Sequence, residues 1–349
     1  MSCPMNHPAS GPQTPLNYPF PVTDPFALPP EFAVLRQERP VCPVRVATGD
    51  EVWLVTRHAD VRAALADRRL SRNIFRPDAA RLIPGVPTGQ VSSPFVDPPA
   101  HTRWRKLVTR AFTPRHVESM RPAVGKTVDL LVDELEAGPR PADLVSAFGY
   151  PLSIRVLCEL LGVSVEQHEP FRALADTALT IDGAPSEDKA SARVELHAFA
   201  ARLVAAKRAD PGPDLLSQLV EAVDAEDGRL SEPELVATVL AMLIGGYESA
   251  VHQIGKGLLA LLRWPEQRAR LGADPSRIAA AVEEILRFAA LDSGFGSPRY
   301  ATADVEIGGV TLPAGATVLV IRQSADRDPS AWDDPDSFDI GRDARAHTA

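Results

Sequence analysis

The chain has 349 residues, of which 45% are hydrophobic and 24% are charged, and 37 Lys and Arg against 46 Asp and Glu give a net charge of −9. This composition is typical of a soluble globular protein and excludes a disordered chain, a collagen-like chain and a small disulfide scaffold. Nucleic-acid binders are usually basic, so the acidic balance argues against that class of protein.

The first 30 residues form a proline-rich segment with nine prolines and no hydrophobic periodicity. We predict an extended N-terminal arm over residues 1–30 and a single domain over residues 31–349. The arm lacks the basic start and apolar run of a signal peptide. The longest apolar stretch, Leu235–Tyr247, has 13 residues, short of the roughly 20 that span a bilayer. We therefore expect a cytoplasmic protein that does not bind a membrane.

Three cysteines, Cys3, Cys42 and Cys158, occur without any Cys-x-x-Cys spacing. A sparse and odd set of this kind favours free thiols in a reducing compartment. Cys3 and His7 have the spacing of metal ligands, but they lack further partners in the arm.

The first predicted elements are short. A helix is predicted over residues 31–38, two strands over residues 44–47 and 52–56, and a second helix over residues 59–67. The region 74–99 is rich in proline and has no period, so we predict a long loop, which in a compact chain is usually functional.

Helical periodicity then dominates from Pro99 to about Arg287. The predicted helices cover residues 100–112, 115–136, 142–161, 165–180, 187–208, 213–224, 232–263, 265–271 and 275–290. Strands follow at 305–307 and 310–312, flanking Gly308-Gly309 as a hairpin, and at 317–321. The order of a small β part, many helices and a small β part predicts a mainly α (α+β) fold.

The predicted helix over residues 232–263 is apolar on nearly every face before its middle, so we expect it to be buried. Gly245 and Gly246 interrupt it, although each glycine costs about 1 kcal/mol relative to Ala. Three explanations remain open: a flat group pressed against the backbone, a local bulge, or close packing of another helix. Glu248 and Ser249 follow, and such an acid and alcohol can relay protons. The alternative for Glu248 is a solvated carboxylate.

Three further patterns contain charged or basic residues that suggest a site. Glu284 and Arg287 are three residues apart on one helix face, which favours a buried bidentate network or an ordinary surface ion pair. His101 and Arg105 are four residues apart, and they grip a carboxylate or phosphate or belong to a solvated basic face. That face continues through Arg103, Lys106, Arg110 and Arg115. Arg299 follows Pro298 in an extended stretch, facing either a ligand or solvent.

In order and spacing, these segments resemble the bacterial, soluble cytochrome P450 family of heme-thiolate monooxygenases. The similarity extends from about Asp24 to Ala349. Val96–Arg105 with Ala111–Arg115 resembles the family's C-helix, and Ile244–Ser249 resembles the kink of its I-helix. Glu284–Arg287 resembles its ExxR motif. Arg299–Gly309 resembles the Arg before its small sheet, and Arg327–Asp339 resembles its meander. The resemblance implies the P450 fold, a helix-rich domain with small β-sheets.

The resemblance also implies a function and the residues that carry it. It implies heme b (iron protoporphyrin IX), O₂, electrons from a ferredoxin and its reductase, and hydroxylation or epoxidation of a small hydrophobic molecule in natural-product metabolism. His101, Arg105, Arg299 and His347 would hold the heme propionates. Gly245 and Gly246 would admit O₂ and the porphyrin, Glu248 and Ser249 would deliver protons for O–O cleavage, and Glu284 and Arg287 would be structural. The 74–99 loop and the helices over 165–208 would shape the substrate pocket, and the basic face would dock the ferredoxin.

The sequence departs from the family at two places. Ser249 stands where the family usually has Thr, so the rotamer restriction of a β-branched side chain is lost, and coupling is looser or the substrate supplies a hydroxyl. The family's axial Cys falls beyond Ala349, so we expect no metal ligand within this chain and an incomplete version of a full-length enzyme. A non-catalytic binding or recruitment protein with the P450 fold is the alternative, and a nucleic-acid binder using the basic face is a weaker one.

Overall fold

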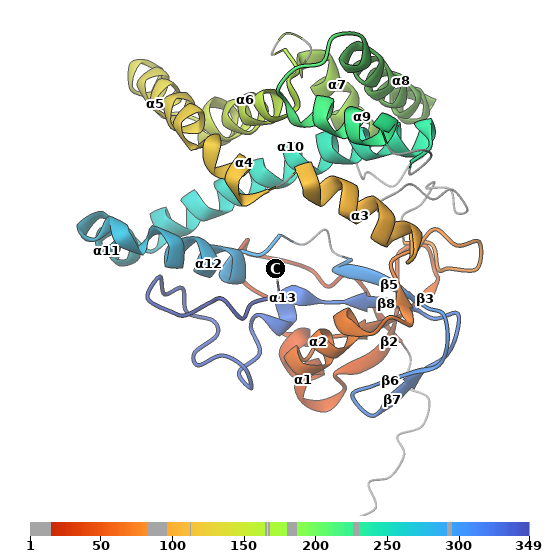
Figure 1. The fold of residues 1–349 in the computed structure, drawn as a ribbon. Helices are drawn as coiled ribbons and strands as arrows, with labels where there is room; N and C mark the ends of the chain where they lie inside the picture. Colours follow the sequence, from red (N-terminus) through yellow and green to blue (C-terminus); the bar gives the residue numbers. More distant parts are fainter. Residues whose placement is uncertain are drawn as a thin grey trace, which may run out of the picture.

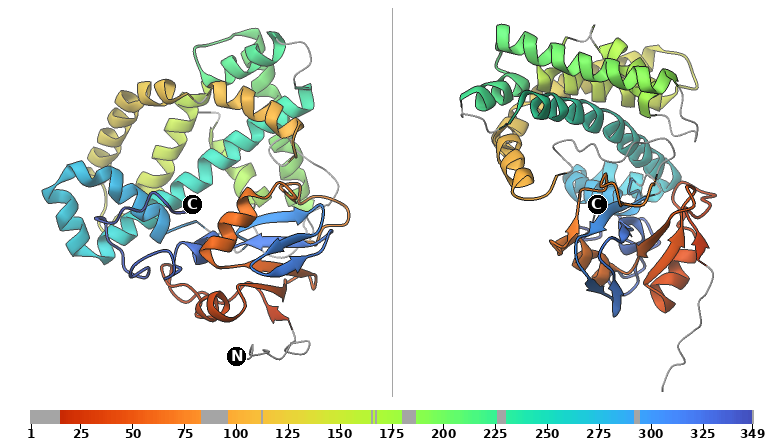
Figure 2. Two further views of the ribbon diagram at one scale, coloured as in Figure 1. Left: turned by 60° about the horizontal axis from the view of Figure 1, so that its bottom comes forward. Right: turned by 90° about the vertical axis from the view of Figure 1, so that its right-hand side faces the viewer.

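The chain folds into two layers in a computed structural model, which describes residues 15–82, 96–111, 113–164, 166, 168–179, 187–225, 230–291 and 295–348. One layer consists of helices, and the other holds the β-sheets with a few short helices (Figure 1). Figure 2 shows that the residues coloured red to orange and most of those coloured blue lie together in the sheet layer, with the C-terminus at its border with the helices. The middle of the sequence therefore builds one layer, and its two ends together build the other.

The larger sheet combines strands from both ends of the chain. Its strands are β1 (Leu16–Asn17), β2 (Val41–Arg45), β3 (Glu51–Val55), β4 (Leu70–Ser71), β5 (Ser297–Ala301) and β8 (Thr317–Val320). Their order is β1-β2-β3-β8-β5-β4. The parallel pair β3–β8 joins Trp53 to Val318, and β8 is buried along its whole length, as expected for a central strand.

The hairpin at Gly308-Gly309 is confirmed. It joins β6 (Val305–Ile307) to β7 (Val310–Leu312), and both strands have the predicted bounds. Gly308 and Gly309 have φ values of 59° and 78°. A two-residue hairpin of this hand requires positive φ at both positions, which glycine adopts without strain.

The described part of the predicted arm, residues 15–30, packs against the rest of the domain. β1 pairs with β2 through Leu16 and Val44. Tyr18, Phe20 and Phe26 are buried, because aromatic side chains spaced among the prolines reach the same core as the sheet. The proline-rich composition thus yields extended backbone without separating this segment from the domain.

The helices lie close to their predicted positions. They are α1 (Glu31–Glu38), α2 (His58–Ala66), α3 (Ala100–Ala111), α4 (Pro114–Ser119), α5 (Arg121–Ala137), α6 (Tyr150–Leu161), α7 (His168–Leu179), α8 (Glu187–Ala209), α9 (Leu215–Ala225), α10 (Glu232–Arg263), α11 (Pro265–Ala273), α12 (Ile278–Phe288) and α13 (Arg322–Ala325). The predicted helix over 115–136 is wrong as one element, since α4 ends before Met120 and α5 starts after it. A π-helical turn, η2 (Val145–Gly149), precedes α6, and a 3₁₀ turn, η4 (Pro275–Arg277), precedes α12.

Helix α10 has the predicted bounds, Glu232–Arg263, and is one continuous α-helix. Its N-terminus has a capping box, in which Ser231 accepts from the Glu234 amide and the Glu234 side chain accepts from the Ser231 amide. A local bulge, one of the three explanations left open for Gly245 and Gly246, does not occur. By length and composition alone α10 could cross a membrane, but it packs against α6, α8, α12 and η2, which identifies it as a core helix.

Candidate active site

The two glycines of α10 have different surroundings. A Cβ at Gly246 would lie 3.0 Å from Cδ1 of Leu157, so this glycine permits close packing of α6. A Cβ at Gly245 would meet no atom within 4 Å, and both glycines are exposed. Close helix packing therefore explains Gly246, whereas Gly245 leaves backbone accessible at the surface of the helix.

The acid and the alcohol follow on the next turn. Glu248 and Ser249 are both exposed. The Ser249 hydroxyl donates to the carbonyl oxygen of Gly245, one turn earlier. A serine bonded in this way needs no partner outside its own helix. Tyr247 points the other way: it is buried, with its ring centroid 5.6 Å from that of Tyr150 and 6.2 Å from that of Phe171.

Helix α3 is fastened to the start of α10 by two contacts. Nη2 of Arg103 lies 2.7 Å from Oε1 of Glu234, and Nε1 of Trp104 donates to Oγ1 of Thr238 at 2.9 Å. Arg103 thus belongs to a helix–helix contact rather than to a free basic face. Lys106 and Arg115 of that predicted face are exposed, and the side chain of Arg110 lies outside the described residues.

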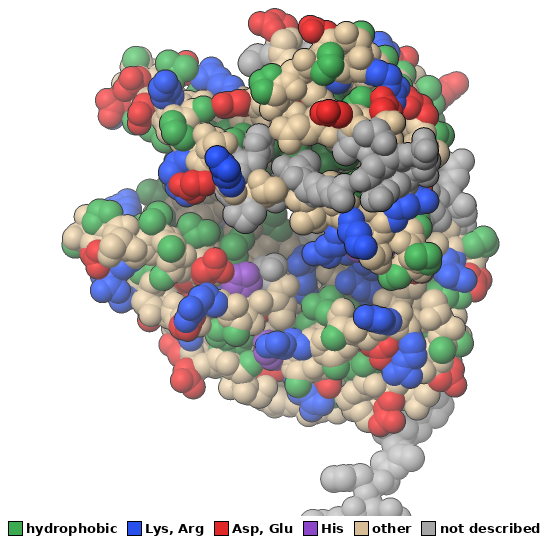
Figure 3. Space-filling model, in the orientation of Figure 1, with side chains coloured by type: hydrophobic (Ala, Val, Ile, Leu, Met, Phe, Trp, Pro, Cys, Tyr) green, Lys and Arg blue, Asp and Glu red, His purple; other side chains and the backbone are tan. Residues whose placement is uncertain are grey.

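His101 and Arg105 belong to a cluster of cations, which we call the cleft cluster: Arg72, His101, Arg105, Arg299 and Arg322. Burial and the charges of Arg72 and Arg322 lower the pKa of Arg299 to about 10. Burial and the charges of Arg72 and Arg105 lower the pKa of His101. Figure 3 shows Lys and Arg side chains gathered in the hollow between the two layers. None of the carboxylates that the structure describes pairs with these four guanidinium groups.

Strand pairing and one side-chain contact bring the cleft cluster together. Arg72 follows β4, in which Ser71 pairs with Tyr300, the neighbour of Arg299. Oγ of Ser71 donates to Oδ2 of Asp97 at 2.5 Å, which holds the start of α3 beside the end of β4. Arg72 and Arg322 were not predicted from the sequence, because only the pairing of distant strands places them near Arg299.

His347, the fourth residue predicted to hold a carboxylate, has another partner. Its Nε2 lies 2.9 Å from Oε2 of Glu283 on α12. The carbonyl oxygen of the next residue, Thr348, accepts from Nη1 of Arg322 in the cleft cluster at 3.4 Å. The structure therefore brings His101, Arg105 and Arg299 together, and it places His347 against α12, beside a residue that contacts the cluster.

Glu284 and Arg287 form the buried network that was one of two alternatives. Nε of Arg287 lies 2.7 Å from Oε2 of Glu284, and both side chains have 0% exposure. Arg287 also donates to the carbonyl oxygens of Asp326, Pro335 and Ser337 at 2.7, 2.9 and 3.1 Å. The pair thus fixes the path of residues 326–337, and a surface ion pair is excluded.

The cleft fits part of a heme group. The two carboxylates of a heme suit the unpaired cations of the cleft cluster. Its flat ring suits the exposed backbone at Gly245, where no Cβ intervenes. The thiols that the structure describes do not fit as iron ligands. Cys42 and Cys158 are buried in hydrophobic cores, and burial raises the pKa of Cys158 to about 11, which disfavours a thiolate. Within the described ranges no three His, Cys, Asp or Glu residues are grouped as metal ligands.

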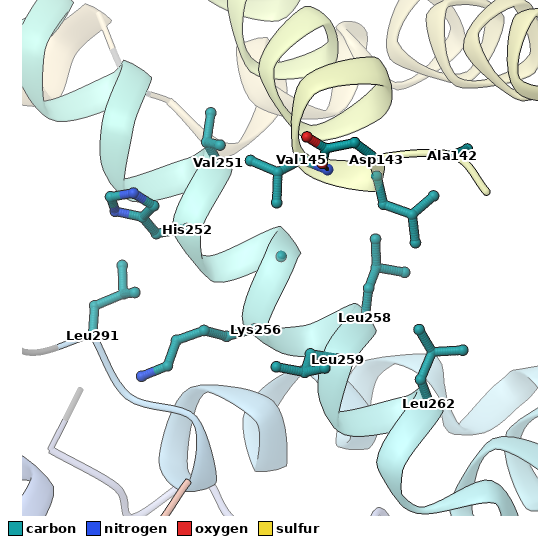
Figure 4. Close-up of a pocket in the computed structure, with 12 residues that line it drawn as sticks. Ala142, Asp143, Val145, Val251, His252, Lys256, Leu258, Leu259, Leu262 and Leu291 are labelled. Atoms are coloured by element: carbon teal, nitrogen blue, oxygen red, sulfur yellow. Dashed lines mark hydrogen bonds between the residues drawn. The ribbon is translucent and has the colours of Figure 1, made fainter. Parts of the chain in front are cut away.

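A separate cavity of about 630 Å³ lies beside the C-terminal half of α10 (Figure 4). Val145 of η2 faces it from one side and Leu259, Leu262 and Leu291 from the other. Leu259 and Leu262 are 44% and 52% exposed. Among the described residues, none of those that line this cavity comes from the 74–99 loop or from residues 165–208, which were predicted to shape the substrate pocket.

The fold is that of a cytochrome P450. The family model "Cytochrome P450" matches residues 184–346. Nocardicin C N-oxygenase of Nocardia uniformis is 42% identical over 95% of this chain and 83% of its own length. 6-Deoxyerythronolide B hydroxylase of Saccharopolyspora erythraea is 41% identical over 90% of this chain and 80% of its own length. The solved structure of the LnmA cytochrome P450 hydroxylase of Streptomyces atroolivaceus has a TM-score of 0.86 and 39% identity, and the match covers 95% of this chain and 84% of that chain.

The chain belongs to the cytochrome P450 family. Its relatives include hydroxylases, epoxidases and monooxygenases from actinomycetes. The predicted family, mainly α fold and class of enzyme are therefore confirmed. The roles of the individual site residues remain predictions.

Proposed function

We propose that this P450 inserts oxygen from O₂ into a small hydrophobic natural product, by hydroxylation or epoxidation, in the cytoplasm. Heme b is the proposed cofactor, and a ferredoxin with its reductase is the proposed electron source. The observation that carries the proposal is the combination of the cleft cluster with exposed backbone at Gly245 in a P450 fold. The relatives named for 6-deoxyerythronolide B and mycinamicin IV act on natural products, which supports this substrate class.

The heme, when bound, activates O₂ for insertion into the substrate. The residues of this chain then bind, orient and supply protons. His101, Arg105 and Arg299 bind the two carboxylates through charge-assisted hydrogen bonds. Fastening of α3 to α10 through Trp104 keeps His101 and Arg105 in position.

Glu248 and Ser249 supply protons to the cleft. The Ser249 Oγ–H points at the Gly245 carbonyl oxygen, and rotation about χ1 turns this proton toward the cleft. Serine lacks the γ-methyl that restricts threonine, so this rotation is less hindered. The Glu248 carboxyl group is exposed, so it contacts water and can pass a proton from solvent to the Ser249 hydroxyl.

A spectrum of the reduced protein with CO tests the proposed function. The protein is expressed at the length that its gene encodes, with a heme precursor, and a thiolate-ligated heme gives the red-shifted Soret band of this class. A protein that takes up no heme overturns the proposal. Heme uptake without that band in the gene-length protein favours the second candidate, a non-catalytic binding protein, because Cys42 and Cys158 are buried and do not fit as iron ligands.

Proton supply is tested with Glu248→Gln and Ser249→Ala. We expect turnover of Glu248→Gln to fall on the order of 10²-fold, the typical contribution of a general acid. Ser249→Ala should divert electrons from product to hydrogen peroxide. Ser249→Thr, which keeps a hydroxyl, should restore the coupling of electron use to product formation. Equal coupling in the original chain, Ser249→Ala and Ser249→Thr would exclude a role for the hydroxyl.

Docking of an acidic ferredoxin is tested at Lys106 and Arg115, which are exposed near α3. Replacing both with Glu should slow electron transfer at low salt and weaken its salt dependence, because steering of opposite charges sets the association rate. Arg193→Glu on α8 is the matched control, since α8 lies on the side of the helical layer away from the sheets (Figure 1). An equal effect of the control would show that only net charge matters.

A further inference from the structure

Of the four residues that the resemblance assigns to the two carboxylates of the heme, the three in the cleft cluster, His101, Arg105 and Arg299, have too few donors for both groups. Two ionised carboxylates present about eight lone-pair sites. Two bidentate guanidinium groups and one imidazole, those of Arg105, Arg299 and His101, fill about five of them. About three acceptor sites therefore remain for other donors of the chain.

Arg72 and Arg322 lie where these donors are needed. Arg72 is next to Ser71, which holds both the strand beside Arg299 and, through Asp97, the start of α3. Its charge acts on Arg299 and on His101. Arg322 is the first residue of α13, directly after β8, which pairs with the strand that carries Arg299. Its charge also acts on Arg299.

The cleft cluster contrasts with arginines elsewhere on the surface. Arg69 and Arg81 are more exposed than Arg322, yet each lies within 3.0 Å of an Asp carboxylate. Arg322 donates only to the carbonyl oxygen of Thr348, at 3.4 Å, among the contacts that the described ranges provide. Like charges brought together repel one another, so a group of this kind is stabilised by a bound anion.

We propose that Arg72 and Arg322 are further binding residues of the cleft cluster, so that four guanidinium groups and one imidazole bind the two carboxylates of the porphyrin. This assignment rests on the proposed function, because that function supplies the ligand. Arg322 is half-buried and Arg72 is exposed, so Arg322 contributes more to affinity than Arg72, whose charge is better screened.

Metal-free protoporphyrin IX and its dimethyl ester distinguish this role from others, because the ester has the same ring without the charges. Binding to the full chain is followed by quenching of Trp fluorescence, to which Trp104 contributes beside His101 (ring centroids 5.5 Å apart). For the free acid, we expect Arg322→Gln to weaken binding about tenfold and Arg72→Gln about threefold. Ester binding should be unchanged, and Arg322→Lys should recover part of the loss.

Arg193→Gln on α8 is the matched control, and it should bind both porphyrins as the original chain does. Unchanged affinity of both cleft variants for the free acid would overturn the assignment. Equal losses for acid and ester would also overturn it, since they would show an effect on the fold.

If the original chain binds neither porphyrin, the proposed heme function fails, and the cluster is tested on its own with inorganic pyrophosphate. Weaker pyrophosphate binding in both variants would then retain the anion-binding role. Unchanged binding would overturn that role as well.

Discussion

The molecule contains two groups of arginines in opposite circumstances. Arg287 and Arg327 are buried, and their guanidinium groups meet carboxylates and backbone carbonyl oxygens. Arg72, Arg299 and Arg322 belong to the cleft cluster, in which the charges of Arg72 and Arg322 help to lower the pKa of Arg299. None of the three pairs with a carboxylate that the structure describes. An arginine that is buried with all its partners is structural, whereas a group of arginines without counter-charges marks a site for an anion.

The largest expected effect comes from the buried group. Arg287→Ala removes the two hydrogen bonds that hold the buried Glu284 carboxylate, leaving it the Asp339 amide and Arg342 at 3.5 Å. It also leaves three carbonyl oxygens without their donor. We expect the free energy of unfolding to fall by about 3–5 kcal/mol, measured by urea denaturation. Arg277→Ala is the control, because the Arg277–Asp274 pair is exposed and such pairs contribute about 0–1 kcal/mol. Similar losses in both variants would contradict the distinction.

A smaller effect is expected from the contact that holds α3, which carries His101 and Arg105 of the cleft cluster, against α10. Trp104→Phe removes the hydrogen bond from α3 to Thr238, and we expect a loss of about 1 kcal/mol in the free energy of unfolding. Porphyrin affinity should fall with it, since α3 carries His101 and Arg105. Unchanged affinity at reduced stability would show that this contact does not position the cleft cluster.

In the cleft, removing an arginine should not destabilise the porphyrin-free protein. Arg299→Gln relieves repulsion from Arg72 and Arg322, so we expect the free energy of unfolding to stay the same or rise by up to about 1 kcal/mol. The effect should shrink in high salt, where charges are screened. A loss of more than about 1 kcal/mol would place Arg299 with the structural arginines.

The smallest expected effect is a pH dependence from His101. Its pKa in the folded chain lies below the ordinary value of 6.5 because of burial and the charges of Arg72 and Arg105. In the window between the folded-state pKa and 6.5, the unfolded chain binds more protons, so the free energy of unfolding rises with pH there and levels off above it. Arg72→Gln should raise the His101 pKa toward 6.5 in an NMR titration. A pKa that does not move would separate Arg72 from the cluster.

Local signals predicted much of the fold. The capping box at Ser231 and Glu234 sets the start of α10, and the glycine pair at 308–309 sets the hairpin. Both depend on residues that are neighbours in sequence, which is why their bounds were predicted correctly. The break at Met120 was missed, although Pro122 stands in the first turn of α5, a position where proline is favoured at the start of a helix.

The candidate site was predictable only where its residues share one helix. His101 with Arg105, and Glu284 with Arg287, follow from helical spacing. Arg72 meets Arg299 through the pairing of β4 with β5, and Arg103 meets Glu234 across two helices that are far apart in sequence. Contacts of this kind depend on tertiary packing, for which a single sequence gives no periodic signal.

The network around Arg287 also has an evolutionary consequence. Residues 326–337 are held through their carbonyl oxygens, and every amino acid has a carbonyl oxygen. Side chains at Pro335 and Ser337 are therefore free to vary between species without loss of this anchor. An insertion or deletion in the segment would instead move the carbonyl oxygens away from Arg287. Selection should accordingly conserve the length of this segment more strictly than the identities of its residues.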